Sequence, residues 1–238
     1  MSTFSERLAN LSLPSIIVIT AVLFALRYLL GKQKSAGARS AAEICESLLI
    51  AVVLVFLVIK PFIVQTFFIP SESMVPTLEI SDHLLVNRFV YRFQSPKRGD
   101  IVVFKAPLTA TDGEDKDFIK RLIGLPGDVL QIKVEGVDPL YGLPFGTLYV
   151  NGKRSEERYL DEQHHILCAP IRTNPLDTTH PSIDLRQPYK VPTGTYFMMG
   201  DNRNNSNDSR YWGPLDKSRV IGKAAVLFWP VNRASAFH

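Results

Sequence analysis

Cysteine is scarce in this chain, and so is any concentration of positive charge. The 238 residues include two cysteines, Cys45 and Cys168, which are too few for a disulfide framework or a cysteine-rich zinc site. The net charge is +4, and the basic residues are scattered among comparable numbers of acids, which is not typical of a nucleic-acid-binding protein. We expect two unpaired thiols, no cofactor and no nucleic-acid partner.

Histidine is also absent from the segments that are richest in reactive side chains. This argues against a Ser-His-Asp triad. His164 and His165 are adjacent and would point apart on a strand, and no second cluster of ligands follows them. We therefore expect no metal site. The five histidines are His83, His164, His165, His180 and His238.

Two long apolar runs follow a short N-terminal tail (residues 1–10). The runs cover residues 11–30 and 44–65, and each reaches the roughly 20 residues that a transmembrane helix needs. No small-x-small cleavage site follows the first run, so a cleavable signal peptide fits poorly. A buried core helix is the alternative for each run. The prediction is two transmembrane helices that form a multi-pass anchor.

The loop between the runs (residues 31–43) indicates the orientation of this anchor. It carries Lys32, Lys34 and Arg39, whereas only Arg7 precedes the first run near the membrane. Because positive loops stay in the cytoplasm, the loop is predicted there. The residues after 65 would then lie on the outer, periplasmic face of the cytoplasmic membrane.

From residue 66 onward the sequence alternates between strand-like segments and turns. Segments such as DIVVFKA, FIKRLIG and TYFMMG are rich in β-branched or apolar residues, and Pro, Gly and Asn separate them. The fold class is therefore mainly β, with an antiparallel β domain in two parts (66–134 and 193–238). The segment 135–192 is predicted to be an insertion or subdomain. Arg98-Gly99-Asp100 resembles an adhesion tripeptide, but a turn before the strand IVVF is favoured.

Three segments combine reactive side chains with residues that restrict the backbone. In residues 69–78, Ser71 and Ser73 lie between two prolines that narrow the backbone's conformations. In residues 118–128, strand alternation requires Lys120 or Arg121 to point where apolar neighbours point. A buried lysine without a carboxylate partner loses its proton and becomes a general base.

The third segment, residues 200–215, is dense in side chains that bond to their own backbone. Ser206 can orient an amine there, and Asp208 can pair with Arg210. Each segment also has a plainer interpretation. The first and third can be hydrated loops, and the two basic residues of the second can be solvated at an edge strand.

Taken in order, PSESM, RGDIVVF, FIKRLIGLPGD and GDNRNNSNDSRYWG resemble the conserved boxes of bacterial type I signal peptidases. The similarity runs from Lys60 to Arg233, apart from the insertion. It implies a serine endopeptidase that removes signal peptides from exported preproteins after small residues at positions −1 and −3. The implied partners are these preproteins, the lipid bilayer and the protein-export translocon nearby.

The resemblance also implies roles for individual residues. Ser73 corresponds to the nucleophile and Lys120 to the general base. The Ser71 hydroxyl and the Ser73 backbone N–H correspond to the oxyanion hole, and Ser206 to the residue that hydrogen-bonds the lysine amine. Three further positions correspond to structural support of the site: Gly200, Asp208 and Arg210.

Met74 corresponds to a residue beside the substrate pocket. Two positions depart from the common family pattern: Glu72, where a small residue is more usual, and Asn204, where aspartate is more usual. Two alternatives stay open. The chain can be another kind of Ser-Lys protease, or a non-catalytic, membrane-anchored β domain that binds secretory proteins.

Overall fold

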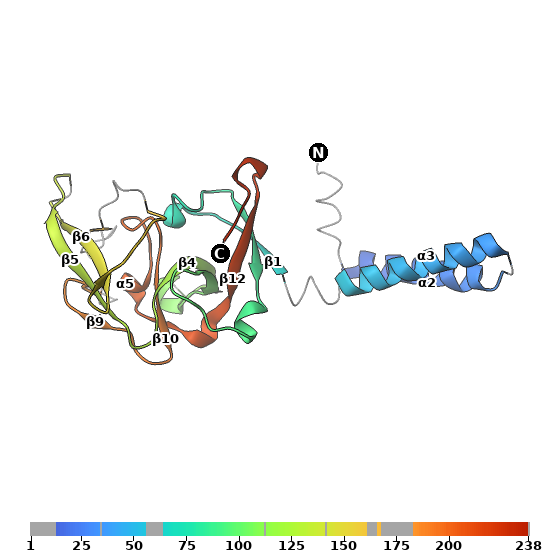
Figure 1. Cartoon of the computed structure of the whole chain (residues 1–238), viewed down its shortest axis with the longest axis horizontal. Coiled ribbons are helices and arrows are strands. Elements are labelled where there is room, and N and C mark those ends of the chain that lie inside the picture. The colour runs from blue at the N-terminus through green and yellow to red at the C-terminus, as the bar shows by residue number, and fades with distance from the viewer. Residues whose placement is uncertain are drawn as a thin grey trace. The chain divides into compact units, whose positions relative to one another are not determined.

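The computed structural model describes residues 13–33, 35–55, 64–111, 113–140, 142–160, 166–167 and 183–237. The chain divides into two compact units, Met1–Gln65 and Thr66–His238. Figure 1 shows two helices in the first unit and the strands that make up the second.

The first unit contains the helices α2 (Leu13–Gly31) and α3 (Ala36–Val53), which pack against each other. Ser35 caps α3 by accepting the Ala38 N–H at 3.2 Å, so α3 begins well before the predicted residue 44. Within the described part of the chain, no helix has both the length and the apolar character needed to cross a membrane. The two predicted spans are not confirmed, and residues 11–12 of the first and 56–63 of the second lie outside the described residues.

The second unit is built around an eight-stranded sheet. Its order is β1-β2-β12-β3-β4-β10-β11, with β13 paired to β12. Every pairing whose register is described in this sheet is antiparallel, which confirms the predicted mainly β fold. The strands are β1 (Val64–Phe68), β2 (His83–Asn87), β3 (Ile101–Lys105), β4 (Asp117–Gly124), β10 (Thr195–Met199), β11 (Leu215–Asp216), β12 (Val220–Trp229) and β13 (Ser235–Ala236).

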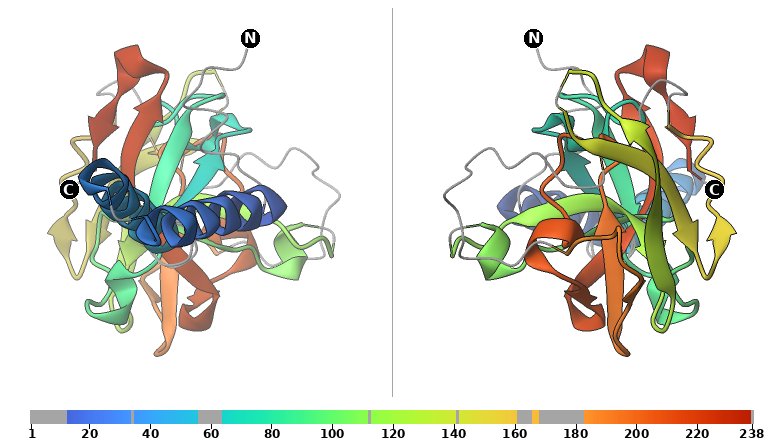
Figure 2. Two further views of the ribbon diagram at one scale, coloured as in Figure 1. Left: turned by 90° about the vertical axis from the view of Figure 1, so that its right-hand side faces the viewer. Right: turned by 90° about the vertical axis from the view of Figure 1, so that its left-hand side faces the viewer.

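A second, five-stranded sheet has the order β7-β6-β5-β9, with β8 paired to β6. Its strand β5 starts at Val129, so the sheet begins before residue 135, the predicted start of the insertion. Its strands are β5 (Val129–Val137), β6 (Pro144–Val150), β7 (Lys153–Arg154), β8 (Ile166–Leu167) and β9 (Tyr189–Lys190). In Figure 1 β5 and β6 lie at one side of this unit and β1 and β12 at the other, and Figure 2 shows β5 and β6 from the front in its right-hand view.

A shared apolar core joins the two sheets. Leu130, Ile132 and Leu148 of the second sheet pack with Phe197 and Met199 of β10, and all five are almost fully buried. The four apolar residues that begin β3 are buried as well, because this central strand is covered on both faces. Strand β4 lies between β3 and β10 in the same sheet, so side chains on β4 are held rigidly.

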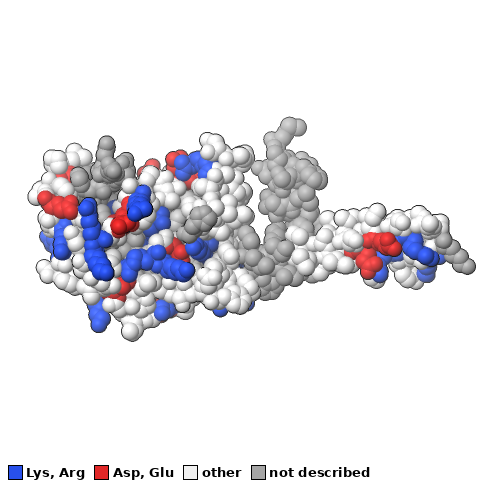
Figure 3. Space-filling view, in the orientation of Figure 1, with Lys and Arg blue, Asp and Glu red and all other residues white. Residues whose placement is uncertain are grey.

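Short helices connect the strands. Before β3, Gly99 has φ +91° and the Asp100 N–H bonds to the Lys97 carbonyl, so the tripeptide 98–100 forms the predicted turn. The short helices are η2 (Glu72–Met74), η3 (Val90–Arg92), η4 (Leu108–Ala110), α5 (Ser209–Trp212), η5 (Lys217–Arg219) and η6 (Val231–Arg233). On the face in Figure 3, basic side chains of this unit lie beside acidic ones.

Candidate active site

Lys120 and Ser73 meet inside the second unit. Lys120 lies on β4, and Ser73 is the middle residue of η2, the short helix that follows the extended Ser71. The two residues are 4% and 9% exposed, and the Lys120 Nζ hydrogen-bonds to the Ser73 Oγ at 2.6 Å. The tertiary structure thus brings together two residues that are 47 positions apart in the sequence.

Burial controls the protonation of this lysine. It lowers the pKa of Lys120 from 10.5 to about 8, while the carboxylates of Asp208 and Asp201 act in the opposite direction and Arg210 acts with burial. No ion pair of Lys120 occurs among the described residues. The amine is therefore neutral in a substantial fraction of molecules near pH 8, as a general base requires.

Arg121, which follows Lys120 in β4, is buried too. The alternative in which Lys120 and Arg121 are both solvated at an edge strand is therefore wrong. The Arg121 guanidinium makes two hydrogen bonds to Asp201, at 2.8 and 2.6 Å, and a third to the Gly99 carbonyl at 2.8 Å. Thr77 donates its hydroxyl to the same carboxylate. The pair of Arg121 and Asp201 was not among the predicted site residues. The sequence did contain a hint of it, because each of the two residues directly follows a predicted site residue, Lys120 or Gly200.

Ser71 lies next to the dyad. Its Oγ is 3.3 Å from the Ser73 Oγ, and its side chain caps no helix. The residue is exposed, whereas Ser73 is buried. An exposed hydroxyl therefore lies within 3.3 Å of the buried Ser73 hydroxyl.

Asp208 and Arg210 form the expected pair. Asp208 caps α5, its Oδ2 lies 2.8 Å from the Arg210 Nη2, and it accepts the Gly200 N–H at 3.1 Å. Burial by itself raises the pKa of Asp208, but Arg210 outweighs this effect and the pKa lies below its ordinary value. The ionised carboxylate therefore ties the loop before α5 to Gly200.

Gly200 has no room for a side chain. A Cβ at this position would lie 2.3 Å from both the Ser206 Oγ and the Ser73 carbonyl oxygen. The Ser206 Oγ is buried and makes no hydrogen bond to Lys120 among the described residues, whereas Ser206 is one of the groups that lower the pKa of the Asp208 carboxyl. The hydroxyl is instead packed against Gly200.

Met74 follows Ser73 in η2, and its position beside the substrate pocket stays a prediction. It is fully buried and packs with Leu78, Leu84 and Ile101, so it supports Ser73 from the core side. Of the two departures from the family pattern, Glu72 is exposed and accepts a bond from Asn205 at 3.3 Å. The other, Asn204, accepts the backbone N–H of Leu167 with its side-chain oxygen.

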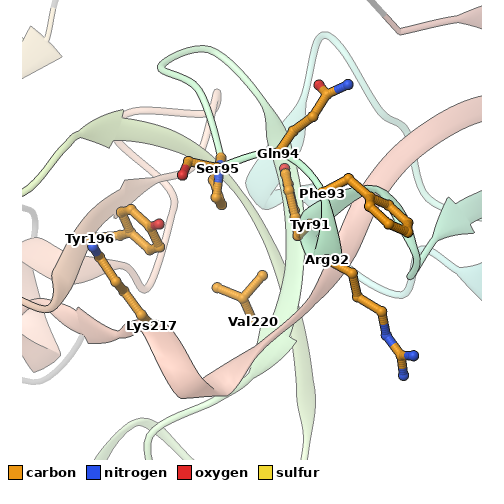
Figure 4. A pocket seen from close by; sticks show the side chains of 9 residues that line it. Tyr91, Arg92, Phe93, Gln94, Ser95, Tyr196, Lys217 and Val220 are labelled. Atoms are coloured by element: carbon orange, nitrogen blue, oxygen red, sulfur yellow. The ribbon is translucent and has the colours of Figure 1, made fainter.

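A pocket elsewhere in the unit contains none of these residues. Tyr91, Tyr196, Lys217 and Val220 are among its lining residues (Figure 4). Among the described residues, no group of three His, Cys, Asp or Glu side chains is arranged to hold a metal. Four of the five histidines and Cys168 lie outside the described residues.

Comparison with known proteins identifies the family of this chain. Residues 41–229 match the family described as signal peptidase, peptidase S26. A signal peptidase I from Leptolyngbya laminosa is 38% identical over 74% of this chain and 73% of that protein, and signal peptidase I P from Bacillus subtilis subsp. natto is 39% identical over 79% of this chain and 89% of that protein. A solved signal peptidase I from Enterococcus faecalis V583 is 27% identical and covers 56% of this chain and 98% of that chain, with a TM-score of 0.36, which supports no conclusion about the fold. By the family match and these identities, the chain belongs to the signal peptidase family, peptidase S26.

Proposed function

We propose that this protein is a type I signal peptidase, a serine endopeptidase that removes signal peptides from exported preproteins with Ser73 as nucleophile and Lys120 as general base. The observation that carries this proposal is the buried contact of 2.6 Å between the Lys120 Nζ and the Ser73 Oγ. A hydroxyl becomes a competent nucleophile when an adjacent base takes its proton. The sequence relatives that are named signal peptidase I support the choice of substrate.

The reaction would proceed in two steps. In the first, the Ser73 Oγ attacks the scissile carbonyl carbon while the neutral Lys120 amine takes its proton, and the resulting ammonium donates that proton to the leaving amine. In the second, Lys120 takes a proton from water, whose oxygen attacks the acyl-enzyme. The Ser73 Oγ then leaves and recovers a proton from Lys120.

The developing negative charge needs donors outside the dyad. The Ser73 backbone N–H and the Ser71 hydroxyl are the two groups that the proposal assigns to this oxyanion hole. Ser71 supports the assignment because its Oγ lies 3.3 Å from the Ser73 Oγ and the residue is exposed. The preference for small residues at −1 and −3 would come from shallow pockets beside the extended substrate.

The membrane anchor is part of the proposal as well. In the first unit, Ile17, Phe24 and Leu29 of α2 and Ile44 of α3 each expose more than half of their area. In the second unit, Phe68 and Trp229 are similarly exposed. Exposed apolar groups of this kind suit a lipid environment. Co-flotation of the purified chain with lipid vesicles tests this step, and a chain that stays out of the lipid fraction would contradict it.

Cleavage of a model preprotein by the detergent-purified chain tests the activity. We expect Ser73→Ala and Lys120→Met each to abolish cleavage, and we expect wild-type activity to fall as the pH drops below about 8, because protonation removes the base. Cleavage by either variant at the wild-type rate would refute the dyad. Binding of the preprotein without cleavage by the wild type would favour the non-catalytic alternative.

A further inference from the structure

Arg203 connects the second sheet to the loop of the active site. It is 1% exposed, and its two terminal nitrogens bond to the carboxylate of Glu157 at 2.9 and 2.6 Å. Tyr159 completes the contact, because its hydroxyl accepts a bond from Arg203 at 3.1 Å and donates one to Glu157 at 2.9 Å. Glu157 and Tyr159 lie just after β7, in the chain that leaves the second sheet.

The same arginine reaches toward the dyad. Its Nε donates to the Gly200 carbonyl at 3.0 Å. The backbone of residues 200–202 in turn packs on Ser73, because the Asn202 N–H donates to the Ser73 carbonyl at 3.1 Å and Gly200 leaves no room for a Cβ there. A continuous path of bonds therefore runs from Glu157 through Arg203 to the backbone that holds the nucleophile.

A second contact joins the same two parts of the unit. The side-chain oxygen of Asn204 accepts the backbone N–H of Leu167 at 3.0 Å, and Leu167 belongs to β8 of the second sheet. Arg210 also donates to the Arg203 carbonyl, so the pair of Asp208 and Arg210 is attached to the same turn. Residues 200–206, called the active-site turn, are thus bonded to Leu167 of the second sheet through Asn204 and to Ser73 through Asn202.

We propose that Glu157 is a positioning residue, through which the second sheet holds residues 200–206 against Ser73 and Lys120. The inference rests on the proposed function for its catalytic consequence. A buried arginine requires a partner, and Glu157 supplies the charge that outweighs the effect of burial and keeps the pKa of Arg203 above its ordinary value. Without the charge of Glu157, residues 200–206 lose their attachment through Arg203, and water can reach Lys120.

The test compares Glu157→Gln with Glu156→Gln in the full chain. Glu156 is a matched control, because its side chain is 76% exposed against 9% for Glu157, and its ion-pair partner among the described residues, Arg158, is 88% exposed. We expect hydrogen exchange at the Asn202 amide to become at least about tenfold faster in Glu157→Gln and to stay unchanged in Glu156→Gln.

Activity provides the second readout. The groups that act on the charge of Lys120 are Asp201, Asp208 and Arg210, and they are intact in both variants. We expect Glu157→Gln to lower kcat and to move the midpoint of the pH profile upward, because hydration of Lys120 brings its pKa back toward 10.5. A general loss of stability would lower the active fraction without moving this midpoint.

Tyr159→Phe is a milder variant in case Glu157→Gln fails to fold. It removes the hydroxyl that accepts a hydrogen bond from Arg203. We expect a smaller increase in exchange at Asn202, a smaller loss of kcat and a smaller upward shift of the pH midpoint. Unchanged exchange at Asn202 in both variants, an unchanged or lower pH midpoint, or equal effects in Glu156→Gln would overturn the inference. Exchange needs no substrate, so if the wild type cleaves no preprotein, the proposed function fails while the exchange data still decide the attachment.

Discussion

Lys120→Met should remove a penalty that the folded protein carries at neutral pH. The buried amine has a pKa of about 8 instead of 10.5, and a tenfold change in proton affinity corresponds to about 1.4 kcal/mol. Between these two pKa values, Lys120 is protonated in the unfolded chain and largely neutral in the folded chain. Between about pH 8 and pH 10.5 the free energy of unfolding of the wild type rises with pH, and below pH 8 the penalty is about 3 kcal/mol.

Methionine has a similar length and no charge, so the variant avoids this penalty at every pH. It loses the hydrogen bond to Ser73, which costs about 1 kcal/mol at either pH. The pH-dependent part of the difference between the variant and the wild type isolates the effect of burial. We expect this difference to favour the variant by about 2.5 kcal/mol more at pH 7 than at pH 10.

Urea unfolding followed by tryptophan fluorescence measures these values. Both tryptophans, Trp212 and Trp229, lie in the unit Thr66–His238, so the signal reports on the unit that contains the active site. Other groups titrate alike in the two proteins and cancel in the difference. A difference in free energy that is the same at pH 7 and pH 10 would refute the argument that burial sets the protonation of Lys120.

Two further predictions concern the surroundings of the dyad. Ser71→Ala should lower kcat about hundredfold with little change in KM, because an oxyanion-hole donor acts in the transition state; an unchanged kcat in steady-state cleavage would exclude this role. Gly200→Ala should lower kcat more than about tenfold, because its Cβ would lie 2.3 Å from the Ser73 carbonyl oxygen. Gly37→Ala, where nothing lies within 4 Å, is the control in the same assay, and equal activities would contradict the crowding at Gly200.

Much of the β unit could be predicted because its information is local. The run Ile101–Phe104 is β-branched and aromatic, and it forms a central strand that is buried on both faces. Alternation in residues 118–123 also required a basic side chain to point inward. It could not say that both would, because the partner of Arg121 is Asp201, 80 positions away along the chain.

Two of the expectations that the structure does not match depended on the direction of single side chains. Ser206 was expected to bond to Lys120, but its hydroxyl packs against Gly200 and makes no hydrogen bond to that amine among the described residues. The plainer interpretation of Arg121 was a solvated side chain, but it is buried and bonded to Asp201. Both outcomes depend on how separate elements pack, which the spacing of residues within one segment does not reveal.

Local sequence was enough to show which residue types were available for catalysis and where the backbone was restricted around them. Ser73 between two prolines and Lys120 in an apolar strand are both features of this kind. Only the folded chain shows the contact of 2.6 Å between these side chains and the bonds from Glu157, which follows β7, to Arg203. Desolvation and charge pairing depend on what surrounds a group in space, and those neighbours come from distant parts of the chain.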